Sequence, residues 1–86
     1  MDIGVEISLY PLRADFAPSI RDFIERLRAY GRLRVVSNSM STQVFGGYDE
    51  VFDVLRRELR AAFEQPGAGK AVFVMKVLGP LSSESA

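Results

Sequence analysis

The sequence contains no cysteine and no histidine. The absence of cysteine excludes disulfides, thiol nucleophiles and thiolate metal sites. The absence of histidine removes the side chain that most often serves as a general base near neutral pH and as an imidazole ligand to metals. We therefore expect a protein that is not an enzyme and that uses no metal and no organic cofactor.

The chain also lacks an excess of charge, because eleven Lys and Arg residues balance eleven Asp and Glu residues. Nucleic-acid binders usually carry a basic excess, since neutralising phosphates supplies much of their affinity. No apolar run approaches the roughly 20 residues that span a bilayer. Asp2 and Glu6 interrupt any signal-peptide pattern at the N-terminus. We expect a cytoplasmic protein with no nucleic-acid partner and no membrane insertion, and near-neutrality favours self-association.

The spacing of apolar residues predicts six elements in one domain. A period of two over residues 3–10 indicates a strand, and a period near 3.6 over residues 16–30 and 48–64 indicates two helices. Further strands are predicted at 33–37, 40–46 and 71–78. A tight turn at Asn38–Ser39 joins the middle two, because Asn tolerates the left-handed backbone that such turns often need. We expect the domain to cover residues 1–79, followed by a flexible tail over 80–86.

The order β-α-β-β-α-β predicts a ferredoxin-like α+β fold, with a four-stranded antiparallel sheet and two helices on one face. Alternation places these residues on the helix-facing side: Ile3, Val5, Ile7, Leu9, Leu33, Val35, Met40, Val44, Phe73, Met75 and Val77. It places these on the open side: Glu6, Ser8, Tyr10, Val36, Asn38, Ser41, Gln43, Phe45, Val72, Val74 and Lys76. Glu6 and Lys76 are expected to pair, because the first and last strands are antiparallel neighbours.

The open face has two interpretations. Its apolar residues would form a contiguous exposed patch, which usually marks an interface or a ligand surface. In the first interpretation two identical copies pack sheet to sheet and the polar residues are incidental, which periodicity alone favours. In the second, polar side chains line a small-molecule pocket beside that contact. These residues are Ser8, Tyr10, Asn38, Ser41, Thr42 and Gln43.

Other functions find less support. An RNA-recognition sheet would carry stacking aromatics on its central strands, where this chain offers only Tyr10 and Phe45. Glu6 and Tyr10 are the acid–base candidates of the open face, and they form no evident dyad. The carboxylates at the start of the second predicted helix (Asp49, Glu50 and Asp53) lack a loop that supplies carbonyl ligands, so a solvated helix start explains them better than a metal site.

Four short sequence motifs follow one another along the chain. They are Ser8-Leu9-Tyr10-Pro11, Asp15-Phe16, Ser41-Thr42 with Gly46, and Asp-Glu-Val-Phe-Asp at 49–53. In this order and spacing the chain resembles the YkoF-like family of thiamin- and hydroxymethylpyrimidine-binding proteins over about residues 3–78.

The resemblance implies ferredoxin-like units that work in pairs, either as tandem repeats or as identical subunits. With one unit here, it implies a homodimer or homotetramer that forms through the open sheet face. It also implies non-catalytic binding of thiamin or hydroxymethylpyrimidine, in salvage or uptake of thiamin or its precursor. The candidate ligand-binding residues are Ser8, Tyr10, Ser41 and Thr42, with Asn38, Ser39 and Gln43 as neighbours. The alternative is a structural or regulatory homo-oligomer without a ligand.

Overall fold

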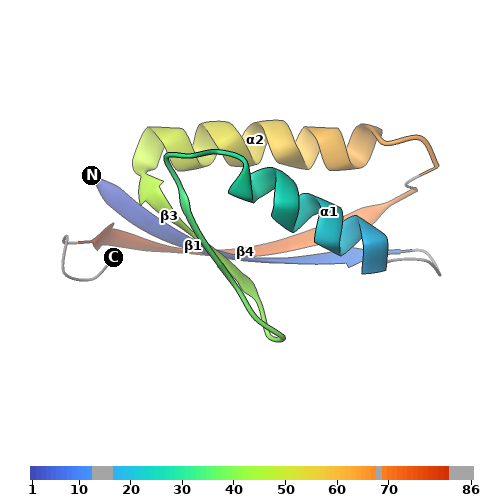
Figure 1. The fold of residues 1–86 in the computed structure, drawn as a ribbon, viewed down its shortest axis with the longest axis horizontal. Helices are drawn as coiled ribbons and strands as arrows, with labels where there is room; N and C mark the ends of the chain where they lie inside the picture. The colour runs from blue at the N-terminus through green and yellow to red at the C-terminus, as the bar shows by residue number, and fades with distance from the viewer. Residues whose placement is uncertain (13–16, 68, 82–86) are drawn as a thin grey trace.

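Six elements make up the fold in a computed structural model that describes residues 1–12, 17–67 and 69–81. They are β1 (Asp2–Pro11), α1 (Ala17–Arg28), β2 (Arg34–Ser37), β3 (Thr42–Gly47), α2 (Tyr48–Glu64) and β4 (Ala71–Leu81). The strands form one antiparallel sheet in the order β2-β3-β1-β4. Both helices lie on the same side of this sheet (Figure 1). The ferredoxin-like fold predicted from the sequence is confirmed.

The core lies between the sheet and the two helices. Alternating residues of β1 and β3 meet the apolar stripes of α1 and α2, which repeat every three or four residues. The buried apolar residues are Ile3, Val5, Ile7, Phe23, Leu27, Val44, Val51, Val54 and Leu55. Leu9, Leu33, Val35 and Phe73 pack against this core while partly exposed. Most residues predicted for the helix-facing side therefore occupy it.

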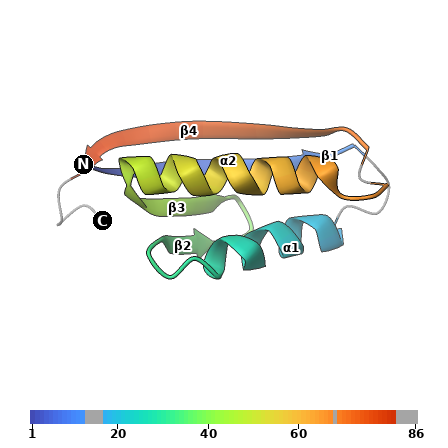
Figure 2. The same ribbon diagram turned by 90° about the horizontal axis from the view of Figure 1, so that it is seen from above.

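Three residues of that predicted set are not covered. Met40 lies in the hairpin turn rather than in a strand, and it is 86% exposed. Met75 and Val77 do lie on the helix-facing side, opposite Ile7 and Val5 of β1, yet both are exposed. The reason is the position of β4 at the sheet edge, outside α2 in Figure 2. Phe73 of this strand reaches the rings of Phe23 and Phe63, but Met75 and Val77 stay exposed.

The last strand is longer than predicted. It continues through Gly79 and Pro80 to Leu81, which pairs with Asp2 after a register shift. An edge strand tolerates proline because one side of the strand needs no hydrogen-bond donors. Strand structure therefore extends into the segment predicted as a tail, and residues 82–86 of that prediction lie outside the described residues.

A polar cluster links α2 to α1 and to Tyr30, which closely follows α1, with Glu58 on the buried face of α2. The Glu58 carboxylate of α2 is buried, and the Tyr30 hydroxyl donates a 2.7 Å hydrogen bond to its Oε2. Arg26 Nε of α1 lies 2.7 Å from Glu58 Oε1, as an ion pair rather than a well-aligned hydrogen bond. The hydrogen bond to Glu58, with burial and the charge of that carboxylate, raises the pKa of Tyr30 above its usual value of 10.0.

The raised pKa of Tyr30 predicts a loss of stability in alkali. A group whose pKa is higher in the folded state stabilises the fold fully below its unfolded pKa, near 10.0, and loses that contribution as pH rises through the folded pKa. The free energy of unfolding, measured with urea at about pH 8 and about pH 11, should fall with pH in the wild type. In Tyr30→Phe this fall should be smaller by about 1 kcal/mol. The difference is modest because the hydrogen bond is partly exposed and therefore partly screened. Tyr48→Phe is the matched control and should behave as wild type. Equal losses in all three proteins would contradict this role of Tyr30.

Candidate functional site

A cleft opens where the sheet loses one of its ladders. β1 pairs with β3 only up to Ile7, opposite Thr42, although β1 itself continues to Pro11 beside β4. The end of β1 and the tip of the β2–β3 hairpin therefore part, and α1 lies over the gap on the helix side. The cleft has a volume of about 190 Å³. Its lining residues are Ile7, Ser8, Leu9, Tyr10, Ile20, Phe23, Ile24, Ser37, Asn38, Ser39, Met40, Ser41 and Thr42.

The hairpin wall of the cleft is fixed by the side chain of Asn38. Its Oδ1 accepts hydrogen bonds from the backbone N–H of Met40 at 2.8 Å and of Ser41 at 3.0 Å. The Asn38 N–H donates to the Ser41 carbonyl at 3.1 Å. The turn thus spans residues 38–41 rather than two residues, and no described non-glycine residue has a positive φ. Asn38 is a turn residue as predicted, but through its side-chain acceptor instead of a left-handed backbone.

Hydroxyl groups around the cleft divide into those already bonded and those available. Ser37 Oγ and Thr42 Oγ1 lie 3.1 Å apart and bond to each other. Ser41 Oγ donates to Glu6 Oε2 at 3.0 Å, and Lys76 Nζ lies 3.9 Å from Glu6 Oε1, which confirms the predicted Glu6–Lys76 pair. The Ser8 and Tyr10 hydroxyls make no hydrogen bond to another residue that the structure describes. They can therefore bond a ligand without losing an internal partner.

Six of the seven predicted site residues line this cleft. They are Ser8, Tyr10, Asn38, Ser39, Ser41 and Thr42. Thr42 belongs to the helix-facing side, whereas Ser8 and Ser41 belong to the open side. The cleft brings them together because it passes through the sheet plane at the point where the ladder ends. Gln43 lies outside the lining, on the open face between Glu6 and Val36.

Sequence reasoning missed the apolar half of the lining. Ile20, Phe23 and Ile24 of α1 close the helix side of the cleft, and Ile7 and Leu9 of β1 border it. Ile7 and Leu9 were predicted on the helix-facing side of the sheet, and the three α1 residues lie within the helical period of residues 16–30. Nothing in that spacing shows which turn of α1 lies over the end of a ladder, because this depends on how far β3 extends.

The described part of the cleft is uncharged. None of the lining residues that the structure describes is Asp, Glu, Lys or Arg. A site for a phosphate would normally supply cationic side chains. The volume of about 190 Å³ is below the roughly 300 Å³ at which pockets for drug-sized molecules begin. The cleft therefore suits one neutral ring that carries hydrogen-bonding groups.

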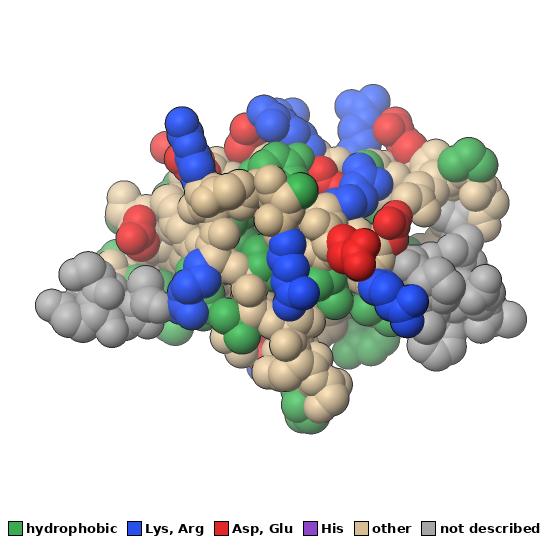
Figure 3. Space-filling model, viewed as in Figure 1, with side chains coloured by type: hydrophobic (Ala, Val, Ile, Leu, Met, Phe, Trp, Pro, Cys, Tyr) green, Lys and Arg blue, Asp and Glu red, His purple; other side chains and the backbone are tan. Residues whose placement is uncertain are grey.

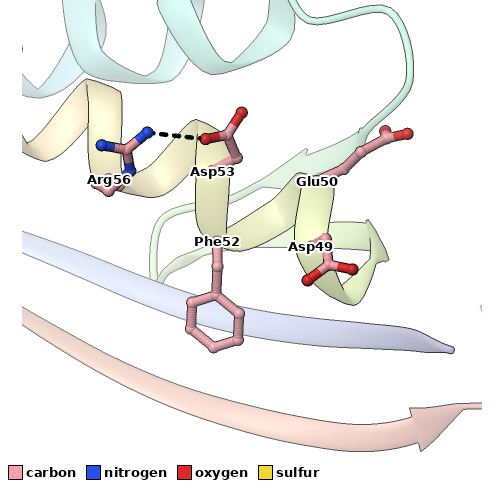
Figure 4. A pocket seen from close by; sticks show the side chains of 5 residues that line it. All are labelled: Asp49, Glu50, Phe52, Asp53 and Arg56. Carbon is pink, nitrogen blue, oxygen red and sulfur yellow. Dashed lines mark hydrogen bonds and ion pairs between the residues drawn. The ribbon is translucent and has the colours of Figure 1, made fainter.

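A second depression, of about 430 Å³, lies at the start of α2 (Figure 4). It carries three carboxylates, but Asp53 turns toward Arg56 while Asp49 and Glu50 point elsewhere. Asp53 forms ion pairs with Arg56 at 3.0 Å and Arg57 at 2.8 Å. Among the described residues no group of three or more carboxylates is placed to hold a metal ion. Side chains of both charges are interspersed over the helices (Figure 3), as on a solvated surface.

The fold and the cleft define a ferredoxin-like α+β domain with a cleft between α1 and the β2–β3 hairpin. Residues 2–76 match the YKOF-related Family, and the chain belongs to this family. No curated protein matches the chain. In the part of the chain that the structure describes, no helix is long and apolar enough to cross a membrane.

Solved structures from three organisms share the fold. A hypothetical protein of Methanocaldococcus jannascii has a TM-score of 0.80 and 22% identity, covering 99% of this chain and 87% of its own. A Thermotoga maritima protein called a "putative thiamine biosynthesis/salvage protein" has a TM-score of 0.82 and 19% identity, covering 98% and 92%. A Streptococcus pneumoniae protein has a TM-score of 0.73 and 19% identity, covering 94% and 89%. At these identities the likeness shows the fold alone.

Proposed function

We propose that this protein is a non-enzymatic binding module for thiamin or hydroxymethylpyrimidine, and that the pyrimidine ring occupies the cleft between α1 and the hairpin. The observation that carries this proposal is the cleft of about 190 Å³, whose described lining is uncharged and gathers six of the predicted ligand residues. Membership of the YKOF-related Family supports a role connected with thiamin, as does the name of the Thermotoga maritima protein. A part in salvage or uptake, and a location in the cytoplasm, remain predictions from the sequence.

The lining can satisfy an aminopyrimidine on its edges and faces. Such a ring is flat, with an exocyclic amine as donor and ring nitrogens as acceptors. The free hydroxyls of Ser8 and Tyr10 can both donate and accept. The backbone of Leu9 adds a donor and an acceptor, since β3 does not continue opposite it. Phe23 and Ile24 supply apolar surface for the ring faces.

The size of the cleft distinguishes the two halves of thiamin. One ring fits inside, so the thiazolium ring would extend toward the open face of the sheet. The Glu6 carboxylate lies there beside Ser41, with its side chain 42% exposed, and a negative charge favours a cationic ring. The phosphate of a thiamin ester would extend past the thiazolium ring, where the Glu6 carboxylate would repel it, and no described lining residue offers a cation. We expect weaker binding of the phosphate esters than of thiamin.

The open face also supports homodimer or homotetramer formation. Tyr10, Val36, Val72 and Val74 of this face are each at least 36% exposed, and exposed apolar patches usually mark interfaces. A second copy packed there would also wall the open side of the cleft. This patch is the observation that favours the alternative function, a homo-oligomer module without a ligand. The two functions differ in their response to ligand.

Thermal unfolding with added ligands tests the proposal. A ligand that binds only the folded state adds RT ln(1 + [L]/Kd), about 2.7 kcal/mol at 100 times Kd. Millimolar hydroxymethylpyrimidine and thiamin should each raise Tm by several degrees, while the isolated thiazole half and thiamin diphosphate should raise it less. If neither hydroxymethylpyrimidine nor thiamin changes Tm, the ligand proposal fails and the homo-oligomer alternative stands.

A further inference from the structure

The outer strand β4 is apolar on both of its faces. Val72, Val74 and Leu78 point to the open side of the sheet, and Met75 and Val77 point to the helix side. All five side chains are between 40% and 66% exposed. A face-to-face partner would cover the first three and leave Met75 and Val77 in solvent. The helix side of this strand therefore needs a different cover.

Among the strands that the structure describes, none pairs with the outer side of β4. β4 ends the strand order, so only its β1 side carries a ladder. The Leu12 N–H donates to the Lys70 carbonyl at 3.0 Å, in the same register as the β1–β4 ladder. Because strand groups alternate in direction, even-numbered residues from 70 to 78 direct their N–H and C=O toward β1. The odd-numbered residues from 71 to 77 direct theirs outward.

Natural edge strands usually carry features that prevent pairing, such as short length, charges or inward lysines. β4 has eleven residues, of which seven in a row from Ala71 to Val77 contain a single charge, Lys76. The opposite edge of the sheet, β2, has only four residues and carries Arg34. A head-to-tail contact of β4 with β2 would be short, would bring Lys76 toward Arg34, and would lead to a ring or an open filament instead of a closed pair. Pairing of β4 with another β4 avoids all three problems.

We propose that β4 pairs antiparallel with β4 of a second copy, about a two-fold axis at Met75, to give a continuous eight-stranded sheet. In this register the outward groups of Met75 bond to their own copies, and Phe73 lies opposite Val77 of the partner subunit. Lys76 then lies opposite Val74 of the partner subunit. An axis at Lys76 would instead place two lysines opposite each other. This interface is separate from the face-to-face contact, and the two together generate a tetramer with two kinds of two-fold contact.

Pairing of β4 predicts a specific pattern of amide exchange. In the wild-type chain at a few hundred micromolar, the N–H groups of Phe73, Met75 and Val77 should exchange at least about 100-fold more slowly than unprotected amides, although they face away from β1. Exchange of these three at the unprotected rate would overturn the proposal.

Light scattering on paired variants gives an independent test. The first change, Phe45→Glu, removes the face-to-face contact and leaves the β4 pair intact. Adding Met75→Lys should then halve the mass, since it places a charge at the centre of the paired edge. Met40→Lys is the matched control, because Met40 is 86% exposed in the hairpin turn and far from β4, and it should leave the mass unchanged. A monomeric Phe45→Glu protein, or equal masses for both double variants, would contradict the β4 pair. The comparison of masses tests the β4 pair even if the protein binds no ligand or forms no face-to-face contact.

Discussion

Replacing Ile24 by tryptophan should abolish binding of hydroxymethylpyrimidine. Ile24 lines the helix side of the cleft and is only partly buried, so the larger side chain can enter the cleft without disrupting the core. An indole ring would take up much of the 190 Å³. Expelling the ligand should lower affinity at least about 100-fold, which corresponds to roughly 2.7 kcal/mol. Calorimetric titration of the variant measures this loss directly.

The control for this change is Glu25→Trp. Glu25 is the next residue of α1 and is exposed, outside the lining of the cleft. The substitution adds the same bulk to the same turn of the helix, about 100° around its axis. Affinity in Glu25→Trp should match wild type. If Ile24→Trp binds as wild type does, or if both variants lose binding equally, the ligand does not occupy the space beneath α1.

Replacing Phe45 by glutamate should halve the mass of the assembled protein. The Phe45 ring lies across β1 on the open face, where a Cβ atom on Gly4 would come within 2.8 Å of it. In a face-to-face complex this ring would be covered, and a buried unpaired carboxylate there would cost several kcal/mol. In a free subunit the Arg34 guanidinium, 4.3 Å from the present ring centre, can accompany the new charge, so the variant should remain folded. Light scattering reports the mass.

The matched control is Phe52→Glu, on the opposite side of the sheet. Phe52 projects from α2 toward β1 and β4 on the helix side (Figure 4). Phe52 is 36% exposed in a depression that it shares with Arg56, so its new carboxylate can stay hydrated. The mass of Phe52→Glu should equal that of wild type. An unchanged mass in Phe45→Glu would show that copies do not meet through the open face.

The sequence predicted the fold well because its information is local. Alternation in β1 and the stripes of α1 and α2 each depend on residues close together in the chain, and the order of elements then determined the topology. The errors occur where covering depends on distant elements. Met75 and Val77 point to the helix side of the sheet, as predicted. Their exposure depends on how far α2 reaches across the sheet.

The candidate site was predictable in part for a related reason. Ser8, Tyr10 and Ser41 were selected as polar residues among apolar neighbours, which a sequence reveals. The cleft itself exists because the β1–β3 ladder ends at Ile7 while β1 continues. That end depends on the side chain of Asn38, which makes the turn four residues long and starts β3 at Thr42 instead of Met40. The α1 residues of the lining could not be selected without this information.

The most direct measurement is a titration of isotopically labelled protein with hydroxymethylpyrimidine, followed by amide chemical shifts. Saturable shifts are expected for Leu9, Ser39 and Ser41, which surround the cleft on β1 and the hairpin, and little change is expected for Asp49 or Asp53 at the start of α2. Absence of shifts at millimolar ligand, or shifts confined to α2, would contradict the placement of the ligand between α1 and the hairpin.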